Sequence, residues 1–181
     1  MTATHPGLLK RMRTAEDEAA APKYAHVERE RRWLVRADAA PAGDDPIAIV
    51  DHYILGTRFR LREMRRGDEM VWKLTKKYDC ADPLARPIVT AYLTRDEYDL
   101  MTTLPARTLG KQRYRVRERG HDFSLDRFNG PLAGLMLAEL EIKDDAALRA
   151  LVDPVWTVRD VSDDARYQGA TLAANGLPEE E

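Results

Sequence analysis

Short runs in which charged and apolar residues alternate are the feature that most constrains the fold of this chain. Between Thr57 and Leu61, arginines at positions 58 and 60 flank Phe59, and Arg62 continues the pattern. Successive side chains of a β-strand point to opposite faces, so a period of two predicts a strand with one basic and one apolar face. Turn-forming clusters, such as residues 39–46, separate such runs, as is typical of an antiparallel all-β protein.

We expect eight strands and two to three short helices along the chain. The strands are predicted over residues 27–36, 47–54, 57–65, 70–78, 86–93, 111–119, 122–128 and 134–143. Thr94 and Glu97 form a capping-box pattern at the start of one helix. Asp144 and Asp145 begin a second, predicted to continue through Leu151 and Val152 to Pro154, and a third begins at Ser162.

One segment is ambiguous, because residues 135–141 consist of strong helix formers although they occupy a position where the pattern needs a strand. Periodicity and propensity disagree there, and the pattern alone does not decide between them.

Length and composition favour one domain. The chain has 181 residues, of which 44% are hydrophobic, enough for one well-formed core and short for two. We divide it into an N-terminal extension (1–22), a domain (23–173) and an acidic tail (174–181). A net charge of -2 argues against partners bound through bulk charge, so we expect neither nucleic acid nor membrane as a partner.

Cys80 is the single cysteine, which excludes an internal disulfide and favours a reducing compartment. No stretch resembles a signal peptide or is long and apolar enough to span a bilayer, so we expect a cytoplasmic protein.

The charged strand faces recur along the chain. Glu28, Glu30 and Arg32 share a face, and basic residues alternate again at Lys73, Lys77, Lys111 and Arg113. A solvated sheet face is the simpler interpretation of any one strand. If several such faces line one barrel, each charge needs a partner of opposite sign, because an unpaired buried ion costs several kcal/mol. Arginine and lysine clusters fit phosphate, and carboxylate clusters fit a hard cation such as Mg²⁺ or Mn²⁺.

A series of motifs in a fixed order resembles the CYTH family, the triphosphate tunnel metalloenzymes. The matching residues are Glu28, Glu30 and Arg32; Arg60 and Arg62; Leu74, Thr75 and Lys77; Lys111, Arg113 and Tyr114; Asp126, Phe128 and Gly130; Gly134, Leu135, Ala138, Glu139 and Glu141; and Trp156, Val161, Ser162, Asp163, Arg166 and Tyr167. The resemblance implies a mainly β (α+β) fold, a closed eight-stranded antiparallel β-barrel with a few flanking helices. It also implies a strand for the ambiguous segment, with Glu139 and Glu141 in the bore.

Two departures from the family pattern bear on activity. Ile88 and Thr90 occupy positions where the family's hydrolases often carry a further pair of glutamates, so part of the acidic set is missing. Arg32 replaces the family's usual lysine, and an arginine that stays protonated cannot act through proton transfer.

The leading hypothesis is metal-dependent hydrolysis of a triphosphate-containing substrate, inorganic or organic, with Mg²⁺ or Mn²⁺ as cofactor. We expect Arg60, Arg62, Lys77, Lys111 and Arg113 to bind substrate; Glu28, Glu30 and Arg32 to be catalytic; and Glu28, Glu30, Asp126, Glu139 and Glu141 to bind metal. Two alternatives stay open: a class IV-like adenylyl cyclase, and a non-catalytic polyphosphate or nucleotide binder. The expected partner is the triphosphate or nucleotide itself, and the sequence is compatible with a homodimer.

Overall fold

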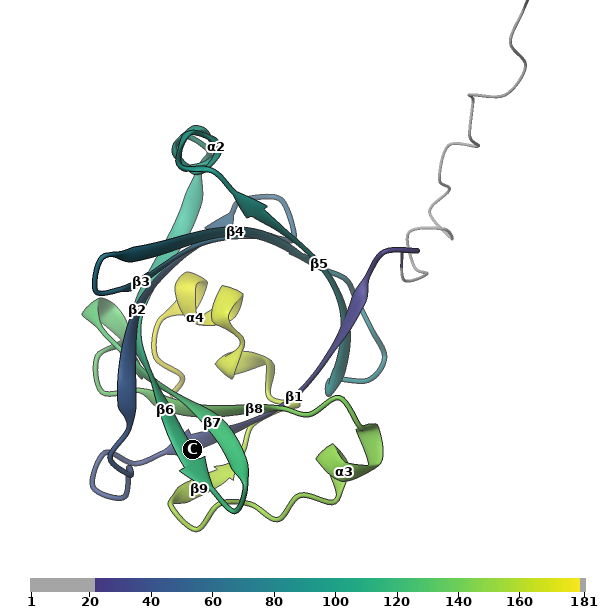
Figure 1. Ribbon diagram of the computed structural model, residues 1–181, viewed down its shortest axis with the longest axis vertical. Helices are drawn as coiled ribbons and strands as arrows, with labels where there is room; N and C mark the ends of the chain where they lie inside the picture. Colours follow the sequence, from purple (N-terminus) through teal and green to yellow (C-terminus); the bar gives the residue numbers. More distant parts are fainter. Residues whose placement is uncertain (1–21, 180–181) are drawn as a thin grey trace, which may run out of the picture.

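A closed antiparallel β-barrel forms the body of the protein (Figure 1). The structure is a computed structural model and describes residues 22–179. The barrel strands are β1 (His26–Val35), β2 (Asp44–Ile54), β3 (Phe59–Arg66), β4 (Glu69–Lys77), β5 (Ala85–Leu93), β6 (Ala106–Glu118), β7 (His121–Phe128) and β8 (Met136–Glu141). The predicted eight-stranded barrel is therefore confirmed. The predicted extension, residues 1–22, lies outside the described residues except for Pro22.

Strand β1 closes the barrel. The strands follow the order β5-β4-β3-β2-β6-β7-β8-β1, and β1 also pairs with β5. The first half of β1 lies against β5, with Glu28 opposite Arg86, and its second half lies against β8, with Arg32 opposite Glu139. A ninth strand, β9 (Thr157–Asp160), which we did not predict, pairs with the end of β1.

The main apolar core packs against the outside of the barrel wall. Trp33 alternates with inward-facing residues of β1 and is fully buried among side chains from β6, β7 and β8. Its ring meets Phe123 edge-on at 5.9 Å between centroids, and Phe123 meets Trp156 at 5.6 Å. Because these aromatic residues supply the core from outside, the inner face of the same strands is left for polar side chains.

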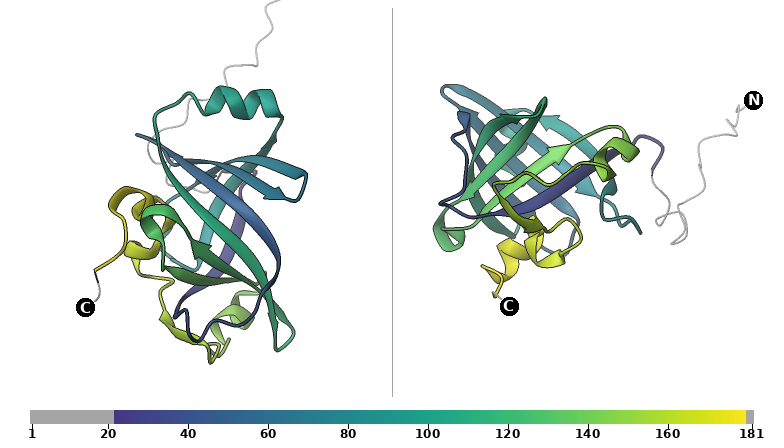
Figure 2. Two further views of the ribbon diagram at one scale, coloured as in Figure 1. Left: turned by 90° about the vertical axis from the view of Figure 1, so that its left-hand side faces the viewer. Right: turned by 90° about the horizontal axis from the view of Figure 1, so that it is seen from below.

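A second cluster closes one end of the barrel. It joins Leu109, Leu137 and Phe128 of the wall to Leu172 of α4 (Gly169–Asn175), the C-terminal helix. Figures 1 and 2 show α4 lying across this end. A side chain at Gly169 would collide with the hydroxyl of Tyr53, so the close approach of α4 to β2 requires glycine.

The helices begin largely where the sequence predicts. The capping box at Thr94 precedes α2 (Arg95–Met101), which packs outside the barrel with Tyr98 buried. Asp144 caps α3 (Asp145–Arg149), but the helix ends at Arg149, so Leu151 and Val152 lie beyond it. The helix expected from Ser162 is instead a 3₁₀ turn, η2 (Ala165–Tyr167), followed by α4; another 3₁₀ turn, η1 (Gly130–Leu132), precedes β8.

Two strand assignments show tertiary structure overriding local pattern. Strand β6 begins at Ala106, five residues before the predicted start, because its first residues pair with the end of β2. Strand β8 confirms the ambiguous segment as a strand, since it pairs with β1 on one side and β7 on the other. Among the described residues, no helix combines the length and the apolar character needed to cross a membrane.

Candidate functional site

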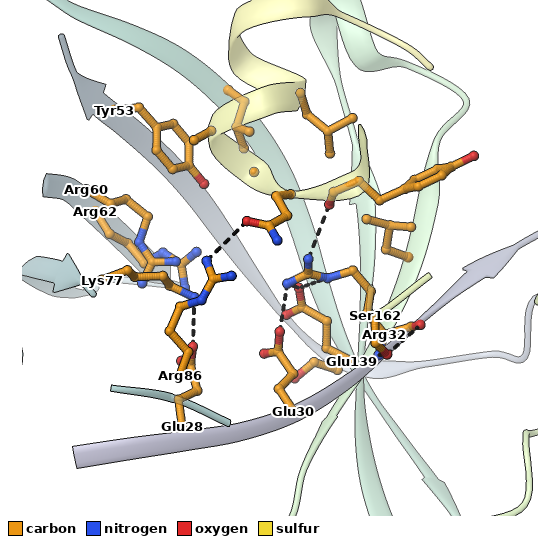
Figure 3. Close-up of a pocket in the computed structure, with 18 of the residues that line it drawn as sticks. Glu28, Glu30, Arg32, Tyr53, Arg60, Arg62, Lys77, Arg86, Glu139 and Ser162 are labelled. Atoms are coloured by element: carbon orange, nitrogen blue, oxygen red, sulfur yellow. Dashed lines mark hydrogen bonds and ion pairs between the residues drawn. The ribbon is translucent and has the colours of Figure 1, made fainter. Parts of the chain in front are cut away.

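A cavity of about 440 Å³ occupies the bore, and ten of the eleven predicted site residues line it (Figure 3). They are Glu28, Glu30, Arg32, Arg60, Arg62, Lys77, Lys111, Arg113, Glu139 and Glu141. They come from β1, β3, β4, β6 and β8, so closure of the barrel brings together residues that are far apart in sequence. The eleventh, Asp126, shares the inner face of β7 with Ser124 and Phe128, but it is fully buried against Lys111 and Arg113 and does not line the cavity.

The carboxylates of β1 and β8 are paired with cations. Lys77 Nζ donates to Glu28 Oε2 at 2.7 Å. Arg32 spans two acids, with Nη2 donating to Glu30 Oε1 at 2.7 Å and Nε donating to Glu139 Oε1 at 2.9 Å. A third nitrogen of Arg32 donates to the backbone oxygen of Tyr167 at 3.2 Å, which connects the acidic wall to the C-terminal segment.

On β7, the strand next to β8, Asp126 holds two cations. Its Oδ2 accepts from Lys111 Nζ at 2.5 Å, and its two oxygens accept from Arg113 Nε and Nη2, each at 2.6 Å. Arg113 also donates to Glu139. Both oxygens of Asp126 are therefore engaged by the residues that we expect to bind substrate, and its side chain does not reach the cavity surface.

Asp51 plays the same part for another pair of cations and was not among the predicted residues. It is 0% exposed, and Arg62 binds it in bidentate fashion through Nε (2.6 Å) and Nη2 (2.7 Å). Arg60 Nε lies 3.6 Å from Asp51 Oδ1; it is buried and donates no hydrogen bond within the described part of the chain. The signal in the sequence was a lone carboxylate inside an apolar strand, where a buried charge needs a partner.

The three central glutamates differ in protonation behaviour. Burial opposes ionisation of Glu28, but the charge of Lys77, its hydrogen bond and the charge of Arg60 outweigh it and lower the pKa. Burial also opposes ionisation of Glu139, yet Arg32, Arg113 and Lys111 lower its pKa well below the usual value. Burial and the negative charge of Glu139 raise the pKa of Glu30, which Arg32 offsets only in part.

The cations respond to burial in different ways. Burial disfavours the charged form of Arg32, but the carboxylates of Glu139 and Glu30 reverse this and raise its pKa, so Arg32 stays protonated. Burial, followed by repulsion from Arg113 and Arg62, lowers the pKa of Lys111 despite the attraction of Asp126.

Further residues of the bore lay outside the predicted set. Arg86 of β5 lines the cavity and donates from Nη1 to Gln168 Oε1 at 3.1 Å, which ties it to the start of α4 (Figure 3). Tyr53 and Ser162 also line the cavity. Thr90 Oγ1 lies 3.0 Å from Thr75 Oγ1, and Ile88 is opposite Lys77 in the strand register, so both departures from the family pattern share the face of Lys77.

The carboxylates of the bore are chemically suited to a hard divalent cation, although most of them are now paired with arginine or lysine side chains. Within residues 22–179, no group of three or more His, Cys, Asp or Glu side chains is gathered as for a metal ion. Glu30 and Glu141 are opposite each other on β1 and β8, and the side chain of Glu141 is 51% exposed, with His26 at 3.5 Å as its contact. Carboxylate oxygens are the ligands that Mg²⁺ prefers. These residues therefore fit the ion once the arginine and lysine side chains paired with them bind another anion instead.

Comparison with known proteins gives two relatives named inorganic triphosphatases; no family model matches the chain. The one from Nitrosomonas europaea is 35% identical over 92 residues, which are 45% of this chain and 61% of the relative. The one from Acetivibrio thermocellus is 35% identical over 65 residues, 36% of this chain and 40% of the relative. The aligned segments thus span less than two thirds of either relative.

Solved structures match over more of the chain. A crystal structure of an inorganic triphosphatase covers 83% of this chain and 97% of its own, with a TM-score of 0.57 and 25% identity. A candidate adenylate cyclase from Bacillus halodurans covers 78% and 98%, with a TM-score of 0.50; at 14% identity it shows the fold alone. The closed barrel with its charged bore and the matches to two inorganic triphosphatases agree with the motif order, and in motifs and fold this chain is similar to the CYTH, or triphosphate tunnel metalloenzyme, family.

Proposed function

We propose that this protein hydrolyses a triphosphate inside its bore, with Mg²⁺ or Mn²⁺ as cofactor. The observation that carries the proposal is the cavity lining, in which eight arginine and lysine side chains and six carboxylates surround about 440 Å³. A polyphosphate with a bound cation can satisfy both kinds of charge, whereas neither a neutral ligand nor a bare anion can. The relatives named inorganic triphosphatases support a linear triphosphate as substrate.

In the proposed mechanism, the substrate takes over cations that are now paired internally. Arg60, Arg62, Lys77, Lys111 and Arg113 would bind phosphate oxygens, and Asp51 and Asp126 would keep the cations nearest to them in place from behind. Charge-assisted hydrogen bonds from buried arginines are strong and directional, so they can hold the chain in line for attack. For Asp126 this is a different role from the metal ligand that the sequence suggested, because both its oxygens already accept hydrogen bonds.

The acidic wall would hold the metal and the attacking water. Glu28, Glu30, Glu139 and Glu141 are the proposed ligands, and the ion would supply positive charge against the phosphate oxygens. One of these carboxylates would also orient the water, and Glu30 is our candidate, because it lies opposite Glu141 and is held beside Glu139 by Arg32. Arg32 would act by charge and by positioning Glu30 and Glu139, because it stays protonated.

The test is a substrate panel of inorganic triphosphate, thiamine triphosphate and ATP, each with Mg²⁺ or Mn²⁺, with all products identified. Release of phosphate from a triphosphate would support hydrolysis, whereas cyclic nucleotide and pyrophosphate from ATP would support the cyclase. Tight binding of a triphosphate without turnover would support the non-catalytic binder instead. Arg60→Gln should abolish most of the activity, and Arg65→Gln is the matched control, since Arg65 is an exposed residue on the other face of the same strand.

A further inference from the structure

Among residues 22–179, Arg86 is the cation of the bore that has no carboxylate partner. The other seven arginine and lysine side chains that line the cavity each form an ion pair with an acid. Arg86 makes no such pair with any described residue, and its hydrogen bond is to the neutral amide of Gln168. Even Glu28, directly opposite Arg86 across the strand pair, gives its carboxylate oxygen to Lys77 instead.

The charges of the bore are consequently uneven along its wall. On β3, β4 and β5, Arg60, Arg62, Lys77 and Arg86 are offset by two carboxylates, Glu28 and Asp51. Around β6, β7, β8 and the end of β1, the cations Arg32, Lys111 and Arg113 are offset by Glu30, Asp126 and Glu139, with Glu141 in addition. One side of the bore thus carries two positive charges in excess, and the other side carries an excess of negative charge.

A terminal phosphoryl group carries roughly two negative charges at neutral pH, which matches the positive excess. Two buried or half-buried donors on this side also have unused capacity: Arg60 Nε makes no hydrogen bond to any residue that the structure describes, and Arg86 uses one donor nitrogen on Gln168. Figure 3 shows Arg60, Lys77 and Arg86 turned toward the same part of the cavity.

We propose that Arg86 binds the terminal phosphate at one end of the substrate, beside Arg60 and Lys77, and that the neutral amide of Gln168 leaves the charge of its guanidinium uncompensated there. This inference rests on the proposed triphosphate site and adds to it both a residue and a direction for the bound chain. One phosphoryl end lies against Arg60, Lys77 and Arg86, and the other lies beside Glu30, Glu139 and Glu141. The C-terminal helix then contributes to substrate recognition through the residue that begins it.

Gln168 allows a test that leaves Arg86 itself unchanged. Its side chain makes no capping hydrogen bond to α4, so replacing it removes no helix cap. Gln168→Glu has the same shape and gives Arg86 the carboxylate partner that it lacks. Gln168→Ala removes the contact without adding charge. If the uncompensated charge of Arg86 recruits phosphate, Gln168→Glu should weaken binding like Arg86→Gln, and Gln168→Ala should have a small effect.

The probe is a non-hydrolysable inorganic triphosphate with nitrogen bridges, titrated with Mg²⁺ by calorimetry into the wild-type protein and each variant. Loss of a hydrogen-bonded charge contact should weaken binding by about tenfold to a hundredfold in Arg86→Gln and Gln168→Glu. Arg65→Gln is the control, because Arg65 is exposed on the outer face of β3 and does not line the cavity. It and Gln168→Ala should stay within about threefold of wild type. Thermal unfolding of each variant checks that it is folded.

The outcomes separate this inference from the proposed function. If the wild-type protein binds the probe and Arg86→Gln binds it equally well, the role of Arg86 is overturned while the triphosphate site stands. Unchanged binding by Gln168→Glu would overturn it too, because the charge would then not matter. If the wild-type protein neither binds the probe nor hydrolyses any triphosphate, the proposed function fails and this inference fails with it.

Discussion

Replacing Asp51 by asparagine tests whether buried carboxylates hold the basic clamp. Asp51 is 0% exposed and Arg62 8% exposed, so the pair is shielded from solvent. Asparagine keeps the shape but leaves the guanidinium of Arg62, and the neighbouring Arg60, without a counter-charge. Removing one partner of a buried ion pair costs about 3–5 kcal/mol, because the remaining charge is left uncompensated.

The effect should be large in a thermal melt. For a domain of this size, each kcal/mol lowers the melting temperature by about 2–4 °C, so Asp51→Asn should lower it by about 6–20 °C. The assay is thermal unfolding followed by circular dichroism at pH 7, with urea unfolding for the free energy. Asp79→Asn is the control: it also breaks an aspartate–arginine pair, but the side chain of Asp79 is 90% exposed, so we expect little measurable change.

The pH dependence has a definite sign. Burial disfavours the carboxylate of Asp51, but the charges of Arg62, Arg60 and Lys111 outweigh it and hold its pKa below the usual range. A depressed pKa contributes stability that is fully present above the pKa of an unfolded aspartate, about 3.9, and is lost as the pH falls through the folded value. The gap between wild type and Asp51→Asn should therefore be full at pH 7 and should narrow in strong acid. A melting temperature within a few degrees of Asp79→Asn would refute the reasoning.

Three further predictions concern the proposed reaction. Excess chelator should abolish hydrolysis, because carboxylates beside a polyanion repel it without a cation; full activity in chelator would contradict this. Glu28→Gln or Glu139→Gln should reduce turnover far more than binding, whereas Arg60→Ala should weaken binding directly, and equal, negligible effects on kcat and KM would count against the site. Since Ile88 and Thr90 supply no carboxylate, the protein alone should bind metal weakly and triphosphate should raise the affinity, which titration of Mn²⁺ with and without a non-hydrolysable triphosphate measures. Equally tight binding of two ions to the free protein would exclude that reasoning.

The strands with charged inner faces could be predicted because a polar bore imposes a period of two. Arg60 and Arg62 alternate with Phe59 and Leu61, and the structure puts the two arginines into the cavity. The motif order then connected strands that no local pattern could connect, such as β1 and β8. The alternation of charged and apolar residues predicted which face of a strand each residue occupies. The order of the motifs predicted which strands meet in the barrel.

Partners across strands could not be predicted in the same way. Asp51 belongs to a strand that is apolar on both faces around it, from Ile47 to Val50, so no alternation marked its side as the inner one. Arg86 precedes Pro87 at the start of β5, a strand in which the family pattern marks positions 88 and 90 and not position 86. Its contact with Gln168 depends on how α4 closes the barrel. Strand β9 has four residues, and it pairs with the edge of β1 that β5 leaves free after Arg29, opposite the edge that pairs with β8.

The internal pairing of the bore explains how a protein with a net charge of -2 can hold so dense a basic site. If the cations of the bore were unpaired, each buried charge would cost the folded protein several kcal/mol of stability. The protein would then unfold or bind any available anion. Pairing six of the cations with Glu28, Glu139, Asp51 or Asp126 removes that cost for them, but it also means that the substrate must compete with the protein's own carboxylates. Those at the cavity surface, Glu28 and Glu139, can yield their cations to phosphate and turn to metal, whereas the buried Asp51 and Asp126 cannot. Selectivity for a triphosphate with its cation then follows, because only a ligand that brings both signs of charge leaves every group in the bore satisfied.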